Sequence, residues 1–456
     1  MATVAIYVQR KYAKQAYKVE SYNVRRWAGI EMIRHSIERQ GATVGYCDFA
    51  TVGDFDVVLV SMTAICDWWT FIAEQATWKT RPIVIVGGCG VLNIRPVLPY
   101  FDIAVFGRGE NIIAPLLDHV GRGVRYEHPS VCYADGFSPD QTYRIAQADQ
   151  PYPHSIDLPE GNFGEERGAY LEESIGCARR CYFCAYSWHR RRSASVGANS
   201  YGSGGSREIT MLDLDMENPQ TWDVFRNIGL DGTSERLRRM ANKKITRDLF
   251  QRMLTNLRHT THKPHQIKAY CVVGYPTETQ EDWAEHLEDL KIADSAMDKA
   301  DKQWPLVLMA SPLRPMPCTP SAYWSIPYKN HRGAIAKALK SPKMPGNVYF
   351  QGENLWAVES MGTESLSSII LELAIIRGVE DDTDPIRKIA TSKRYWNANA
   401  KDKQATAESV LDVGRLFSEY SLDDLPARYL ESYIPNANLY AMGQKSLKAA
   451  TQRAVA

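Results

Sequence analysis

Short, continuous apolar runs that alternate with helical stretches constrain the first 120 residues most strongly. The runs read ATVAIYV, ATVGYCDF, DVVLVSMT, PIVIVGG and FDIAVFG, and a helical stretch at 22–40 separates the first two. Runs that are apolar throughout indicate strands buried on both faces, as in a parallel sheet covered by helices. The sequence therefore predicts a doubly wound, Rossmann-like α/β domain over residues 1–120.

The rest of the chain divides into three parts. Residues 121–166 are rich in Pro, Gly, Asp and Tyr without a sustained period, which is typical of an interdomain linker. Over 167–351 the strand-like segments are AYLEESIG, REITMLDL, RNIGLD, IKAYCVVGY, PLVLMAS and NVYFQG. Helical stretches at 234–257 and 280–295 lie between them, so we predict a second β/α domain. Residues 352–456 are expected to be mainly helical, with SLSSIILELAIIRG as the clearest amphipathic piece.

Charge and hydropathy exclude several classes of protein. Lys plus Arg (54) nearly balances Asp plus Glu (53), so the net charge does not indicate binding to nucleic acid or to a membrane. A nucleic-acid partner would have to bind a local basic patch. No run approaches the roughly 20 apolar residues that span a bilayer. The N-terminal residues also lack the apolar core and cleavage site of a secretory signal. We expect a soluble, cytoplasmic protein.

Nine cysteines are present, and three of them fall within eight residues. An odd count without a signal sequence favours reduced thiols over a disulfide framework. The segment IGCARRCYFCAYSW spaces Cys177, Cys181 and Cys184 as C-x3-C-x2-C. Soft thiolates favour an iron–sulfur cluster, zinc or copper, and three ligands leave one metal position open. The alternatives are a zinc site completed by His189 or a distant cysteine, and three buried thiols without metal.

This spacing, with Phe183 before the third cysteine, resembles the signature of the radical S-adenosylmethionine superfamily. Three further segments resemble motifs of the superfamily in the same order: GLDGTSERLRRMANKKIT, VVGYPTETQEDW and SPLRPMPCTP. The resemblance implies a partial, TIM-like β/α barrel, a [4Fe-4S] cluster on the three cysteines and S-adenosylmethionine on its open iron. One-electron reduction by flavodoxin or ferredoxin would then yield a 5′-deoxyadenosyl radical.

The resemblance also implies cofactor-binding residues. Asp231 and Ser234 would lie near the ribose or carboxylate of S-adenosylmethionine, and Lys243 would approach its carboxylate. The turn at Gly274 would admit the adenine, and Phe183 would lie beside the cofactor. The alternatives are a helix start for Ser234, a solvated helix face for Lys243 and an ordinary turn at Gly274.

One departure from the superfamily pattern concerns Asp213. Few residues separate the segment REITMLDL from GLDGTSE, where the superfamily has room for a further strand, helix and strand. Either the barrel is shortened, or REITMLDL is misaligned. Asp213 and Asp215 are candidate cofactor or substrate ligands at a strand end, where barrel sites lie.

The N-terminal runs resemble the cobalamin-binding domain that precedes the barrel in many radical S-adenosylmethionine enzymes. That resemblance implies a cobalamin site lined by Ser61, Thr63, Gly87 and Gly88 at the strand ends. The motif D-x-H-x-x-G, whose histidine ligates cobalt, is missing, and His35 lies in an expected helix. Two readings stay open: cobalamin bound without a protein imidazole, or a domain that keeps the fold without the cofactor.

The leading function is cobalamin-dependent methyl transfer to an unactivated carbon, with the substrate and the catalytic residues unknown. A methylthiotransferase would bind a second cluster, for which Cys47, Cys66 and Cys89 lack the required spacing. Another radical S-adenosylmethionine modification enzyme, and a non-catalytic protein with a structural cluster or zinc, complete the alternatives.

Overall fold

The computed structural model describes residues 2–9, 28–158, 168–172, 174–177, 179–191, 193–194, 227–256, 267–296, 306–326, 348–350, 364–378 and 383–455. The predicted strand REITMLDL, with Asp213 and Asp215, lies outside these described residues.

Within this part of the chain, the N-terminal sheet has six strands in the order β2-β1-β3-β4-β5-β6. They are β1 (Val4–Tyr7), β2 (Val44–Cys47), β3 (Val57–Ser61), β4 (Ile83–Gly87), β5 (Ile103–Val105) and β6 (Val131–Tyr133). Strands β1 to β5 pair in parallel, and β6 pairs with β5 antiparallel. A largely parallel α/β sheet is therefore confirmed.

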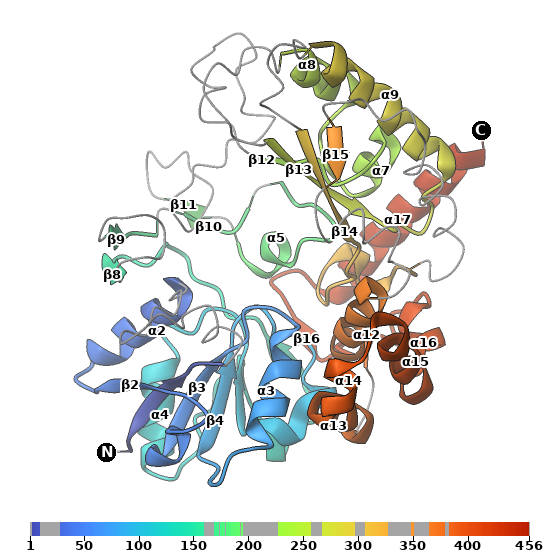
Figure 1. Cartoon of the computed structure of the whole chain (residues 1–456). Coiled ribbons are helices and arrows are strands. Elements are labelled where there is room, and N and C mark those ends of the chain that lie inside the picture. Colours follow the sequence, from blue (N-terminus) through green and yellow to red (C-terminus); the bar gives the residue numbers. More distant parts are fainter. Residues whose placement is uncertain are drawn as a thin grey trace.

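Both faces of this sheet are buried. The helices against it are α2 (Ala28–Glu38), α3 (Asp67–Gln75) and α4 (Ile113–Gly121). Val57 and Leu59 of β3 pack in one apolar core with residues of α2 and α4. Val58 and Val60 pack in a second core with α3 and with C-terminal helices. The alternation places α2 and α4 on one face and α3 on the other, as Figure 1 shows.

Residues 121–166, expected as a linker, contribute strands to the structure. Besides β6, they contain β7 (Tyr143–Arg144) and β8 (Ile156–Leu158). Strand β7 pairs with β16 (Leu430–Glu431), and β8 pairs with β9 (Gly168–Tyr170). Each of these strands spans only two or three residues, which is too short for a sequence period.

A second sheet carries four strands, all parallel, within the described residues. They are β12 (Asn227–Gly229), β13 (Ile267–Val273), β14 (Leu306–Pro312) and β15 (Val348–Phe350). The helices between them are α7 (Glu235–Met240), α8 (Arg247–Asn256) and α9 (Gln280–Ala296). This alternation produces the second β/α unit that the sequence favours.

The helix expected over 234–257 is two helices, so that prediction was wrong. Asn242 takes φ +57°, which ends α7. The amide of Lys243 donates to Arg238 O at 2.7 Å, and that of Asn242 donates to Arg239 O at 3.0 Å. This double hydrogen bond around a left-handed residue is a Schellman motif, which sequence periodicity does not reveal.

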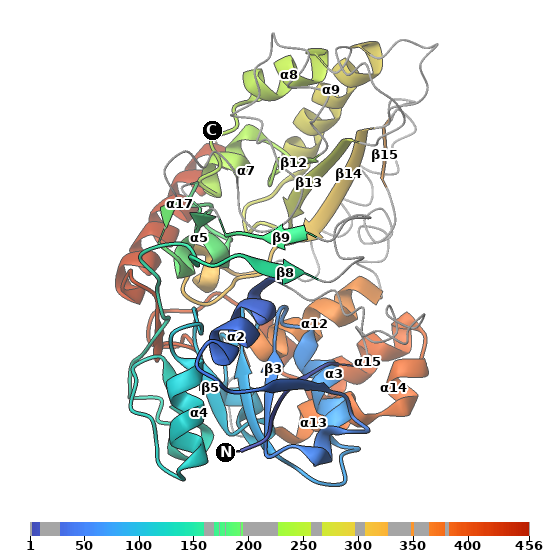
Figure 2. The same cartoon turned by 90° about the vertical axis from the view of Figure 1, so that its left-hand side faces the viewer.

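The C-terminal region is mostly helical and contacts both the N-terminal α/β unit and the second β/α unit. Its helices are α12 (Glu364–Ile376), α13 (Thr383–Thr391), α14 (Lys393–Asn397), α15 (Ala400–Val410), α16 (Val413–Phe417) and α17 (Asn436–Val455). Trp69 of α3 donates through Nε1 to Leu371 O at 2.9 Å. Ser446 of α17 donates to Met240 O at 2.7 Å. Figures 1 and 2 show α12 and α13 beside the N-terminal sheet and α17 along the second unit.

Candidate functional site

The three-cysteine loop lies between the two sheets. It runs from β10 (Ser174–Ile175) to α5 (Ala185–His189), and β10 pairs with β11 (Ser193–Ala194). Figure 1 shows α5 between the N-terminal sheet and the second unit. Cys181 is 7% exposed, whereas Cys177 and Cys184 are half-buried. The loop that carries the cysteines therefore lies at the junction of the two units.

The loop is held by the end of helix α7. The amide of Tyr182 donates to Ala241 O at 2.9 Å, and Asn242 donates through Nδ2 to Arg180 O at 2.8 Å. At the loop's start Gly176 has φ +68°, and a Cβ there would lie 2.6 Å from Arg191 O. Only glycine fits that close approach.

An ion pair lies beside the cysteines. Lys243 Nζ is 2.6 Å from Asp231 Oδ2, and both side chains are mostly buried. Burial opposes the charge of Lys243, but Asp231 and then Cys181 outweigh it and raise the pKa of Lys243. The backbone of Asp231 is fixed because its carbonyl accepts from Tyr275 Oη at 2.7 Å. The structure thus brings two of the predicted cofactor residues together near the second cysteine.

The chemistry of the donor set suits an iron–sulfur cluster. Burial raises the pKa of the Cys181 thiol to about 12, against the opposing effect of Lys243. Burial also raises the pKa of Cys184. Thiols of this kind become thiolates when a metal binds them. The charges of Cys177 and Cys184 both act on Cys181. Three soft donors within electrostatic reach of one another, with a cation beside them, therefore fit such a cluster.

No group of three His, Cys, Asp or Glu side chains among the described residues has the arrangement of a metal-ion site. The fit therefore rests on the donor types and their neighbours rather than on a closed ligand geometry.

Ser234 is placed away from the ion pair. It is the N-cap of α7, where its hydroxyl accepts from the Leu237 amide at 3.2 Å. The same hydroxyl donates to Asp282, and the side chain is buried. These contacts agree with the alternative in which Ser234 starts a helix, because its hydroxyl both donates and accepts a hydrogen bond within the protein.

The turn at Gly274 is built around Glu278. Gly274 has φ +82°, and the space where a Cβ would project holds no atom within 4 Å. The carboxylate of buried Glu278 accepts from the amides of Gly274 at 2.5 Å and Tyr275 at 3.1 Å. Burial raises the pKa of Glu278 to about 7, although these amides oppose the shift. Sequence reasoning included Glu278 in a motif but gave it no role.

Phe183 packs against an apolar cluster that includes Leu237, Tyr275 and Trp324. It joins the cysteine loop to α7 and to the turn after β13. Phe183 therefore packs the cysteine loop against the second unit.

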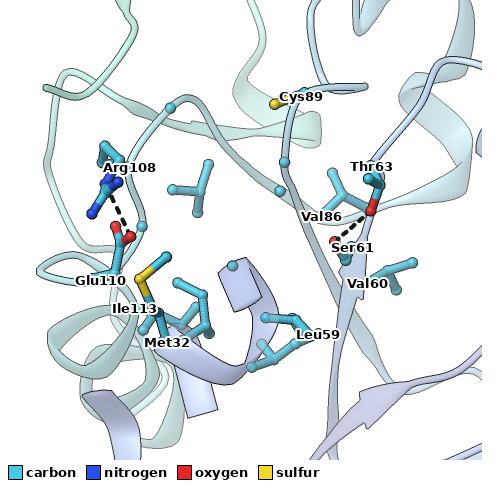
Figure 3. A pocket seen from close by; sticks show the side chains of 18 of the residues that line it. Met32, Leu59, Val60, Ser61, Thr63, Val86, Cys89, Arg108, Glu110 and Ile113 are labelled. Atoms are coloured by element: carbon cyan, nitrogen blue, oxygen red, sulfur yellow. Dashed lines mark hydrogen bonds and ion pairs between the residues drawn. The ribbon is translucent and has the colours of Figure 1, made fainter. Parts of the chain in front are cut away.

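A cavity of about 410 Å³ opens at the carboxyl ends of β3, β4 and β5. Ser61, Thr63, Gly87 and Gly88 all line it, so the structure brings the four predicted residues of the N-terminal domain together. The hydroxyls of Ser61 and Thr63 are 3.4 Å apart, as Figure 3 shows. Position 88 also requires glycine for a structural reason, because a Cβ at its φ of +103° would lie 2.6 Å from Met62 O.

Part of the cavity wall belongs to the cysteine segment. Tyr186 and Arg190, which follow Cys184, line it together with Glu172. Arg108 binds Glu172 with both terminal nitrogens, at 2.6 and 2.7 Å, and lies 3.0 Å from Glu110. Figure 3 shows Arg108 and Glu110 on one side of the cavity. Sequence reasoning gave no role to Arg108, Glu172 or Tyr186, because these residues meet across separate segments.

The remaining cysteine and histidine candidates are dispersed. Cys47 is buried on β2 and Cys66 precedes α3, whereas exposed Cys89 lines the cavity. His35 lies on α2, where Nδ1 is 2.8 Å from Tyr152 Oη, and it does not line the cavity. No described helix is both long and apolar enough to cross a bilayer.

Comparisons with known proteins give partial matches. No family model matches the chain. It is 28% identical over 163 residues to the ribosomal protein uS12 methylthiotransferase RimO of Acidovorax sp., covering 30% of this chain and 35% of that protein. The RimO of Polaromonas naphthalenivorans is 28% identical over 209 residues, covering 40% and 44%. The matches thus span less than half the length of these relatives.

A longer match is to an uncharacterized protein of Methanocaldococcus jannaschii, 22% identical over 60% of this chain and 69% of that protein. Among solved structures, the cobalamin-dependent S-adenosylmethionine radical enzyme OxsB in its apo form aligns with all of this chain and 61% of its own. The sequence identity is 13% and the TM-score 0.31.

Proposed function

Because the chain belongs to the radical S-adenosylmethionine superfamily, we propose that it is an enzyme that cleaves S-adenosylmethionine reductively at a [4Fe-4S] cluster. Cys177, Cys181 and Cys184 would hold the cluster. The observation that carries the proposal is the Lys243–Asp231 pair, which lies beside the buried second cysteine.

The cluster, when bound, would pass one electron from an external reductant to S-adenosylmethionine, whose carbon–sulfur bond breaks to give methionine and a 5′-deoxyadenosyl radical. A flavodoxin or ferredoxin is the expected class of reductant. The protein's own residues bind and orient the cofactor. Lys243 offers a cation for its carboxylate, and the open side of Gly274 leaves room for the adenine against backbone.

Metal analysis tests this proposal. Protein reconstituted anaerobically should hold about four irons and matching sulfide. Cys181→Ala should lose them, because two thiolates cannot retain the cluster, whereas Cys89→Ser should keep them. Near-stoichiometric zinc without iron would instead support the non-catalytic alternative.

For the N-terminal unit we propose cobalamin binding and, with it, methyl transfer to an unactivated carbon. The cavity supports this, because it opens at the strand ends and is lined in part by the segment after Cys184. Cobalamin held there would supply a carrier for the methyl group, and S-adenosylmethionine would be the source of both that group and the radical. Ser61 and Thr63 offer hydroxyls for the corrin amides, and the backbone at Gly87 allows close approach.

Methylthiotransfer is the second candidate, favoured by the matches to RimO proteins. That reaction needs a second cluster, so it predicts about eight irons per chain instead of about four. Cobalamin binding at four irons favours methyl transfer, and eight irons without cobalamin favours methylthiotransfer. The substrate of either reaction is open.

A further inference from the structure

Arg180 is a half-buried cation inside the cysteine loop. It stands between Cys177 and Cys181 and adopts φ +56°. Its guanidinium carbon lies 5.4 Å from the ring centroid of Trp188 and 4.9 Å from that of Tyr433. The Trp188 indole in turn donates to Cys181 O at 2.8 Å. The guanidinium is thus held by two aromatic rings at the loop.

The charge of Arg180 has no acidic partner within the described residues. None of the ion pairs there involves Arg180, and its Nη1 is buried without a hydrogen bond. Burial lowers the pKa of Arg180, and the charge of Cys177 opposes that shift. Arginine stays protonated in proteins, so this positive charge acts within electrostatic reach of the first cysteine and has no acidic partner among the described residues.

A cationic nitrogen that is buried without a hydrogen bond is costly, so an anion beside Nη1 of Arg180 would stabilise this site. A cluster held by three thiolates is such an anion. We propose that Arg180 is the cation that balances the cluster and raises its reduction potential. The inference rests on the proposed function, because it requires the cluster at Cys177, Cys181 and Cys184.

The direction of the effect follows from electrostatics. One-electron reduction by a donor such as dithionite makes the cluster more negative, and a nearby cation stabilises the reduced state more than the oxidised one. Loss of the cation therefore makes reduction harder. A tenfold loss in the equilibrium constant for this one-electron step corresponds to about 59 mV.

The test is a potentiometric titration of the reconstituted full chain, followed by electron paramagnetic resonance of the reduced cluster. Arg180→Met should lower the midpoint potential by the equivalent of about tenfold or more in that constant. Arg180→Lys, which keeps the charge, should stay close to wild type. Arg191→Met is the matched control, because Arg191 stacks on the same Tyr433 ring at 5.5 Å but is exposed.

The outcomes separate this inference from the proposed function. A wild-type chain that forms no cluster contradicts the proposed function. A normal iron content with an unchanged potential in Arg180→Met, or an equal shift in Arg191→Met, overturns the role of Arg180 alone. If Arg180→Met fails to retain iron while Arg180→Lys retains it, the charge requirement is supported.

Discussion

Lys243 and Asp231 form an ion pair with 2.6 Å between Nζ and Oδ2, and the charges of both act on Cys181. Asp231 follows β12, whereas Lys243 follows α7, so the pair joins the two ends of this β/α connection. The Schellman turn at Asn242 sets where Lys243 leaves the helix. This local geometry, rather than a long helix face, presents the lysine to the cysteines.

Lys243→Ala should weaken the binding of S-adenosylmethionine by about 1.5 to 3 kcal/mol without loss of iron, because it removes one charge-assisted contact. Calorimetric titration of the reconstituted protein measures the change. Lys244→Ala is the control, since Lys244 is the exposed neighbour. An unchanged dissociation constant in Lys243→Ala would show that the lysine only neutralises Asp231.

Glu278 should make stability depend on pH. Burial raises its pKa from 4.5 to about 7, so the folded state binds a proton that the unfolded state has already lost. Stability is therefore greatest below pH 4.5, as far as this group is concerned, and falls as the pH rises to about 7. Glu278→Gln keeps an acceptor for the two amides but cannot ionise.

The measurement for Glu278 is the midpoint of thermal unfolding of the metal-free chain at pH 5 and at pH 7.5. Between these two pH values, the free energy of unfolding obtained from the midpoints should fall by on the order of 1 to 3 kcal/mol more in the wild type than in Glu278→Gln. Parallel curves for the two proteins would show that the carboxyl is ionised throughout the range.

The contact between the C-terminal region and the N-terminal sheet depends on Tyr429. Its hydroxyl accepts from the Ile94 amide at 2.8 Å and donates to Asn93 Oδ1 at 3.0 Å. Tyr429→Phe leaves the Ile94 amide without this acceptor and removes one of two hydrogen bonds to Asn93 Oδ1, so we expect a loss of about 1 to 3 kcal/mol in the free energy of urea unfolding. Tyr440→Phe should change little, because no hydrogen bond of the Tyr440 hydroxyl occurs within the described residues. Equal effects would contradict this account of the contact.

Gly87→Leu should block the cavity. A Cβ at Gly87 would lie 3.7 Å from Val105 O, which is an ordinary contact, so the fold should tolerate the change while the longer side chain occupies the cavity. Cobalamin affinity, followed by absorbance, should fall at least about tenfold. Gly121→Leu, outside the cavity and with open space at its Cβ, is the control. Binding unaffected by Gly87→Leu would place cobalamin elsewhere.

The mode of cobalamin binding has its own test. No histidine lines the cavity in the part of the chain that the structure describes. The reduced cobalt(II) form should therefore show no nitrogen coupling from a protein imidazole in electron paramagnetic resonance. Such coupling would contradict binding without histidine, and an absence of binding would remove methyl transfer as the preferred reaction.

Local sequence patterns predicted the strands of the N-terminal sheet and residues that line its cavity. They did not predict the contacts between distant segments of the chain. The apolar runs predicted strands β1 to β5. The glycines and hydroxyl side chains at the ends of these runs were predicted to line a ligand site, and all four of them line one cavity. Ser234 received a cofactor role from a motif, although its hydroxyl binds Asp282, which lies on α9. The contacts of Arg180 with Trp188 and Tyr433 could not be predicted from the sequence, because Tyr433 is far away in the chain.

The central claim is that this chain cleaves S-adenosylmethionine at a cluster on its three cysteines. The most direct measurement is the formation of 5′-deoxyadenosine by reconstituted protein under strict anaerobiosis with dithionite and S-adenosylmethionine. The account predicts 5′-deoxyadenosine from the wild type and none from Cys181→Ala. A wild-type protein that carries four irons but releases no 5′-deoxyadenosine, or a Cys181→Ala protein that releases as much as wild type, would contradict the account.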